Sequence, residues 1–135
     1  MKAIKTLAAV AMAASALLAG PAQAWEPKQP IKIYVGFSPG GGTDIVARTL
    51  VASSQEFFPV PLVVVNKPGA GGTIAADFVA KQKADGYSLL IAGGSESTSV
   101  PNHRDVTYSL ASFEGILRNI RARIILVSKA GSGID

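Results

Sequence analysis

The pattern of apolar positions switches repeatedly between a short extended type and a helical type. Residues 31–35 are β-branched and alternate in polarity, which predicts a strand. From Thr43 onward, apolar residues recur on one helical face, so we predict a helix with Thr43 or Asp44 as its N-cap that ends before Pro59. The predicted face consists of Ile45, Val46, Thr49, Leu50 and Ser53.

The same order of elements then repeats. Residues 62–65 form a continuous apolar run, typical of a strand buried on both faces. A helix is predicted from Ile74 to about Lys83, a third strand at 87–92 and a loop at 93–102. Strands that alternate with helices in this way indicate an α/β fold with a parallel sheet and right-handed crossovers.

The pattern weakens after residue 102. Residues 113–118 fit either a short helix or an extended stretch, and residues 124–127 fit a fourth strand.

The first 24 residues have the three parts of a secretory signal peptide. Lys2 and Lys5 precede an apolar run over 7–18, and a small-x-small cleavage site ends at Ala24. The run is shorter than the roughly 20 apolar residues that a membrane span needs. We therefore expect a secreted protein whose mature chain begins at Trp25. The sequence contains no cysteine, which excludes a disulfide framework and a lipid-attachment site.

Charge and metal-ligand spacing exclude several function classes. The net charge is +4, and two of these charges belong to the predicted signal peptide. This mild excess argues against a nucleic-acid partner, for which a basic stripe is typical. No His, Asp or Glu cluster has metal-ligand spacing, and we expect neither metal nor cofactor.

Two glycine-rich loops, 36–42 and 66–72, each join a strand to a helix. The first turn of a helix has unpaired N–H groups that attract anions, and glycine allows close approach. In open α/β sheets the ligand crevice lies at the carboxyl ends of the strands. The loops could instead serve only as tight turns, but the presence of two favours an anion site.

Better-known uses of such loops fit poorly. Neither loop ends in the Gly-Lys-Ser/Thr of a phosphate-binding loop, and neither has the third glycine of a dinucleotide site. Residues 36–40 match the G-x-S-x-G motif of hydrolases, with Ser38 as nucleophile and a later Asp and His103 in the expected order. However, the residue after the serine is Pro39, which has no N–H for the oxyanion hole, and one lost donor costs ~10²–10³ in rate. A small secreted hydrolase is therefore the weaker alternative.

Several charged residues allow two interpretations. Glu96 follows the third strand, where it could bind an amino or hydroxyl group of a ligand or could face solvent. His103 is expected at the surface. Arg118, Arg121 and Arg123 are expected to form a solvated face, with a carboxylate clamp as the less favoured alternative.

Three stretches, 30–48, 64–76 and 85–90, resemble the Bug-type receptors of tripartite tricarboxylate transporters. The resemblance implies a monomeric periplasmic receptor of the Venus-flytrap fold, not an enzyme, that delivers its ligand to membrane transporter subunits. Its ligands would be small carboxylates: dicarboxylates, tricarboxylates, acidic amino acids, aromatic acids or nicotinate-like compounds. Carried over by position, the ligand-binding residues would be Phe37, Ser38, Gly40, Gly41, Thr43, Ala70, Gly71, Gly72, Thr73, Ser95, Glu96 and Ser97.

The length of the chain departs from this family. Residues 25–123 would form the first lobe and residues 124–135 a crossing strand and the start of a second lobe that this chain lacks. Either a fragment or a truncated reading frame would give this length. A remnant of a receptor gene that binds nothing is a further alternative.

Overall fold

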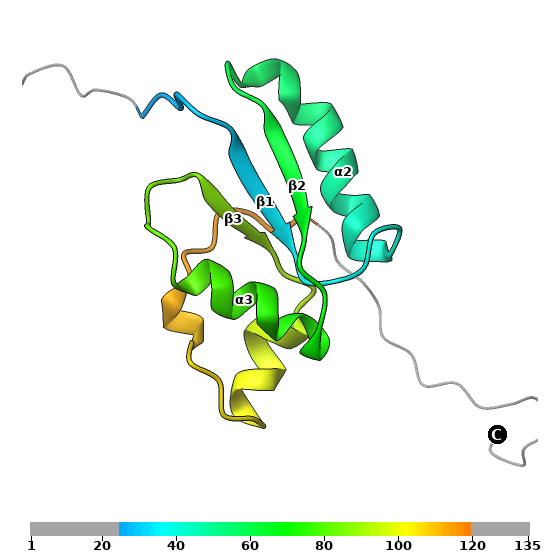
Figure 1. Ribbon diagram of the computed structural model, residues 1–135, viewed down its shortest axis with the longest axis vertical. Coiled ribbons are helices and arrows are strands. Elements are labelled where there is room, and N and C mark those ends of the chain that lie inside the picture. The colour runs from blue at the N-terminus through cyan, green and yellow to red at the C-terminus, as the bar shows by residue number, and fades with distance from the viewer. Residues whose placement is uncertain (1–24, 120–135) are drawn as a thin grey trace, which may run out of the picture.

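The fold is built on a three-stranded parallel sheet, seen in a computed structural model that describes residues 25–119 (Figure 1). The strands are β1 (Ile31–Val35), β2 (Leu62–Asn66) and β3 (Ser88–Ile91), in the order β2-β1-β3. The predicted α/β class and parallel sheet are therefore confirmed. The predicted signal peptide and the predicted strand at 124–127 lie outside the described residues.

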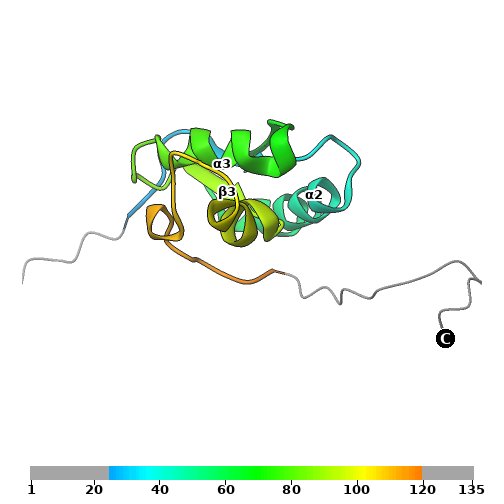
Figure 2. The same cartoon turned by 90° about the horizontal axis from the view of Figure 1, so that it is seen from below.

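Two helices connect the strands on opposite sides of the sheet. Helix α2 (Gly42–Ser54) leads from β1 to β2, and helix α3 (Thr73–Ala80) leads from β2 back to β3. These crossovers run in opposite directions, so a common right hand places the helices on opposite faces, as Figure 2 shows. The ring of Tyr34 in β1 lies 5.0 Å from that of Phe78 in α3, centroid to centroid.

The core sits on both faces of the central strand. Ile31, Ile33 and Val35 are buried on the face toward α2, because alternate residues of a strand share a face. The helices contribute mainly small side chains, and the buried ones are Ala47, Ala75 and Ala76.

The predicted start and face of the first helix were wrong. The N-cap is Gly41, so Thr43 and Asp44 lie inside the first turn of α2. Ile45 is 56% exposed, whereas Asp44 and Ala47 are buried. The helix is rotated relative to the prediction because Asp44 forms polar contacts beneath the adjacent loop.

The prediction that β2 is buried on both faces was also wrong. Val63 is 39% exposed and the other residues of β2 are half-buried. Among the strands that the structure describes, β2 lies at the edge of the sheet, and α3 packs over β1 and β3 instead.

The chain after β3 is more regular than predicted. The expected loop 93–102 contains a π-helical turn, η3 (Ser95–Ser99), and a 3₁₀ turn, η4 (Val100–Asn102). A further 3₁₀ turn, η5 (Leu110–Ser112), precedes residues 113–118, which form neither a helix nor a strand. Helix α3 ends at Ala80, slightly earlier than expected. Within residues 25–119, no helix combines the length and the apolar character that a membrane crossing requires.

Candidate functional site

Three loops meet at the carboxyl ends of the three strands. A Cβ placed on Gly36, after β1, would lie 2.6 Å from the Cα of Gly72, in the loop after β2. A Cβ on Gly72 would lie 3.2 Å from the carboxyl carbon of Glu96, after β3. The ring of Phe37 lies against Gly93, where a Cβ would be 3.1 Å from it. The two glycine loops and the loop after β3 therefore lie against one another at this edge of the sheet.

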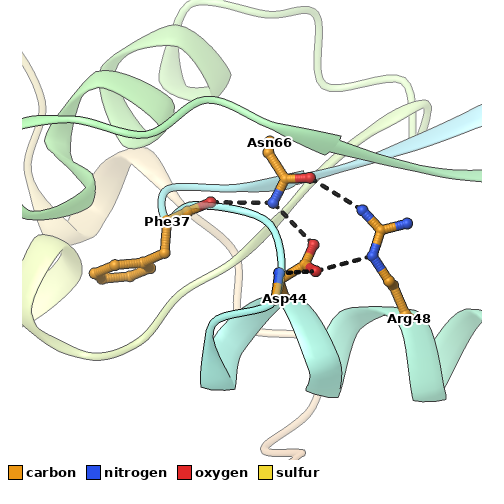
Figure 3. A network of polar contacts seen from close by, with 5 residues as sticks. Phe37, Asp44, Arg48 and Asn66 are labelled. Carbon is orange, nitrogen blue, oxygen red and sulfur yellow. Dashed lines mark hydrogen bonds and ion pairs between the residues drawn. The ribbon is translucent and has the colours of Figure 1, made fainter.

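A buried carboxylate fixes the first loop to its neighbours (Figure 3). Asp44 is 1% exposed, and its Oδ2 accepts hydrogen bonds from the Gly40 amide at 2.8 Å and from Arg48 Nε at 2.9 Å. Its Oδ1 accepts one from Asn66 Nδ2 at 2.8 Å. Asn66, at the end of β2, also donates to the carbonyl of Phe37 at 3.0 Å. The loop is therefore held to both α2 and β2.

These bonds shift the pKa values of the ion pair. The hydrogen bond from Arg48, followed by those from Gly40 and Asn66, holds the pKa of Asp44 well below its usual range, although burial opposes the shift. The bond to Asp44 likewise raises the pKa of Arg48 above its ordinary value. Asp44 is thus a carboxylate whose lone pairs are used inside the protein.

The second loop has a left-handed backbone over four residues. The φ angles are +134° at Gly69, +48° at Ala70, +68° at Gly71 and +93° at Gly72. Positive φ is uncommon for a residue with a Cβ, so Ala70 is the exception among them. The turn is closed by bonds from the Gly72 amide to Gly69 O at 2.9 Å and from Thr73 Oγ1 to Ala70 O at 3.0 Å.

The amides of the predicted site differ in their availability to a ligand. The Gly40 amide donates to Asp44 and the Gly41 amide to Ser38 O, at 3.2 Å. The first intrahelical bond of α2 comes from Ile45. Within residues 25–119, no acceptor contacts the amides at two pairs of positions, one in each glycine loop. They are Gly42 and Thr43, and Ala70 and Gly71.

Glu96 is fully buried, which excludes the alternative in which it faces solvent. Its Oε1 accepts a short hydrogen bond from the Gly93 amide, and its Oε2 accepts one from Ser95 Oγ at 3.1 Å. Tyr108 anchors the same turn by donating its hydroxyl to the Glu96 carbonyl at 2.6 Å. Burial and the nearby acids Glu96 and Asp77 raise the pKa of Tyr108. The alternative role of Glu96, as a ligand contact, stays a prediction.

The remaining predicted residues surround this junction. Ser38 is exposed, and Ser97 Oγ donates to Gly94 O at 3.5 Å. Within the described residues, the side chain of Ser38 has no hydrogen bond to a base of the kind that a hydrolase needs, and His103 is exposed as expected. No group of three or more potential metal ligands occurs between residues 25 and 119.

The sequence analysis missed the residues that hold the site together. Asn66 and Tyr108 contact residues that are distant in the sequence. Arg48 contacts Asp44 from a helix face that the prediction did not include. The only available signal was their location, since Asn66 follows a predicted strand directly and Arg48 lies one turn after Asp44.

A parallel α/β sheet with amide-rich loops gathered at its carboxyl edge defines one lobe of a ligand-binding protein. A family model described as "Tripartite tricarboxylate transporter family receptor" (TctC) matches residues 46–135. The chain belongs to this family of receptors, which is not a family of enzymes. The resemblance stated from the sequence is confirmed.

Individual relatives agree with this assignment. Protein BugT of Bordetella pertussis is 46% identical over 74 residues, which cover 55% of this chain and 23% of BugT. The structure of MatC from Rhodopseudomonas palustris, with bound malate, is 33% identical and gives a TM-score of 0.56, over 62% of this chain and 29% of MatC. The structure of a second R. palustris protein, with adipate, is 38% identical and gives a TM-score of 0.51, over 54% of this chain and 25% of that protein. The chain spans about a quarter of the length of these relatives.

Proposed function

We propose that this chain captures small carboxylates outside the cytoplasm for a tripartite tricarboxylate-type transporter. The observation that carries the proposal is the pair of unsatisfied amide sets, at Gly42 and Thr43 and at Ala70 and Gly71, at one edge of the sheet. Amides at the start of a helix favour an anion through both hydrogen bonding and the helix dipole.

The comparisons support a carboxylate as the anion. Two of the relatives with solved structures contain malate and adipate, which are both dicarboxylates. Asp44 and Glu96 are occupied by internal donors, so neither needs a ligand to satisfy its oxygens. The ligand therefore meets mainly backbone N–H groups and hydroxyls, which suit a carboxylate oxygen.

The proposal includes the route and organisation of the protein. Residues 1–24 direct export and are removed after Ala24, and the mature chain works in the periplasm as a monomer. Residues 25–123 form the ligand-binding lobe, and residues 124–135 begin the connection to a second lobe. Membrane subunits of the transporter are the partners that receive the ligand.

Titration calorimetry of the full chain tests the proposed function. A panel of mono-, di- and tricarboxylates is compared with the corresponding uncharged amides, such as succinate with succinamide. We expect saturable binding of at least one carboxylate and none of its amide. No heat with any carboxylate, from a chain that melts cooperatively, would instead support a remnant that binds nothing.

A further inference from the structure

The side chain of Asn66 joins the two glycine loops at their base. Asn66 is the last residue of β2, pairs in register with Val35 and leads directly into the second loop. Its Nδ2 donates a hydrogen bond to the carbonyl oxygen of Phe37, in the first loop, at 3.0 Å (Figure 3). Because β2 is paired with β1 along its whole length, this contact reaches the first loop from a fixed base.

The neighbours of Asn66 determine which end of its amide faces the first loop. Nδ2 donates to two acceptors, the Phe37 carbonyl and Asp44 Oδ1, whereas Oδ1 accepts a hydrogen bond from Arg48 at 3.2 Å. A side-chain amide has donors at one end and an acceptor at the other, whereas an ionised carboxylate has acceptors only. An asparagine therefore suits this position, and an aspartate would have no donor for the Phe37 carbonyl.

The bond to Phe37 sets the direction of the next backbone amide. The described residues contain no cis peptide bond, and in a planar trans peptide the C=O and the following N–H point in opposite directions. Since the carbonyl of Phe37 points at Asn66, the N–H of Ser38 points away from it. Ser38 is exposed, and within residues 25–119 its amide has no acceptor. This N–H is therefore free to donate to an anionic oxygen of a ligand.

We propose that Asn66 is a positioning residue for carboxylate capture: it holds the peptide between Phe37 and Ser38 so that the Ser38 amide donates to the ligand. This role rests on the proposed function, because Asn66 acts through the backbone of the same site. The nitrogen and the oxygen of its side chain are both engaged inside the protein, so Asn66 does not contact the ligand itself.

Calorimetric titration of the full chain tests this role in Asn66→Ala, with succinate or with whichever carboxylate the parent binds most tightly. We expect about tenfold weaker binding, or about 1.4 kcal/mol, because the peptide is no longer held in place. Gln55→Ala is the matched control. Its side-chain amide likewise bonds to the backbone, at Val60 O and the Leu62 amide, but at the opposite end of β2. Both variants should lower the melting temperature, whereas only Asn66→Ala should weaken binding.

Amide chemical shifts provide a measurement that a loss of stability alone would not change. In the parent, the same carboxylate should shift the Ser38 amide at the concentrations that shift the Gly42 amide. In Asn66→Ala the response of Ser38 should disappear, while Gly71, in the second loop, still responds at higher ligand concentration. A Ser38 amide that does not respond in the parent would overturn the proposal, even if Asn66→Ala fails to fold.

The possible failures separate this role from the proposed function. If the parent binds a carboxylate and the folded Asn66→Ala variant binds it as tightly, the positioning role is wrong and the proposed function stands. The same conclusion follows if Asn66→Ala and Gln55→Ala lose equal affinity, because Asn66 would then act through stability alone. If the parent binds no carboxylate of any kind, the proposed function is wrong and the positioning role with it.

Discussion

At the scale of single residues, the two buried acids hold the loops in place through hydrogen bonds. Asp44 joins the first loop to α2 and β2, and Glu96 closes the turn after β3. Both have donors for each carboxylate oxygen, so a buried charge is compensated in each case. Such residues set the positions of the amides that we propose for ligand binding.

Replacing Asp44 tests this role through stability. Asp44→Asn keeps the shape but turns one acceptor oxygen into a donor, which must then face Asn66 or the Gly40 and Arg48 donors. We expect the melting temperature at pH 7 to fall by roughly 5 °C or more. The matched control, Asp77→Asn, alters a partly exposed ion pair with Lys81 and should lower the melting temperature less.

The same variant carries a pH dependence of known sign. The pKa of Asp44 is lower in the folded than in the unfolded state, so the unfolded chain takes up the proton first as the pH falls below ~4. The contribution of Asp44 is complete above that pH and is lost progressively on acidification. The difference in melting temperature between parent and Asp44→Asn should therefore be smaller at pH 3 than at pH 7. An equal difference at both pH values would contradict the lowered pKa of Asp44 in the folded state.

Glu96 gives a second test at this scale. Glu96→Ala removes a fully buried side chain and leaves the Gly93 amide without its acceptor, and we expect a loss of about 1–3 kcal/mol in the free energy of unfolding. Glu96→Gln should lose much less, because its oxygen can accept from Gly93 while the hydroxyl of Ser95 turns to accept from its NH₂. Urea denaturation measures both, and equal losses would show that the hydrogen bonds are not the cause.

At the scale of elements, the contact between the first two loops depends on glycine at particular positions. Gly36→Ala would place a methyl group 2.6 Å from the Gly72 backbone, so the loops must separate, at a cost of about 1–3 kcal/mol. Gly42→Ala is the matched control, because a Cβ there meets no atom within 4 Å and its φ is not positive. We expect that variant to be as stable as the parent or up to about 1 kcal/mol more stable. Urea denaturation distinguishes them, and equal effects would contradict this packing.

The elements themselves were largely predictable from sequence, whereas their burial was not. The period of two at 31–35 and the glycine loops gave the strands, the crossovers and the edge of the sheet where the site lies. The exposure of Val63 and Ile45 depends on which strand is central and on how α2 is rotated about its axis. Both follow from long-range contacts, such as that of Asn66 with Asp44, which local periodicity does not contain.

At the scale of the whole molecule, Trp25, the residue expected to start the mature chain, packs against a residue next to β3. The ring of Trp25 lies 5.5 Å from that of Tyr87, centroid to centroid, and Gly86 leaves room for it. We predict that mass spectrometry of the exported protein finds Trp25 at the amino terminus. Met1 on the exported protein would contradict the predicted signal peptide.

The central claim, that the two glycine loops hold a carboxylate through their backbone, is tested most directly by mapping amide chemical shifts. Nitrogen–proton correlation spectra of the full chain would be recorded during titration with succinate, and with succinamide as the uncharged control. We predict that the amides of Gly42, Thr43, Ala70 and Gly71 shift first and saturate together with succinate alone. Ser53, in the last turn of α2, and Gln82, just beyond the end of α3, should not move. Shifts confined to other residues, or equal shifts with succinamide, would contradict the account.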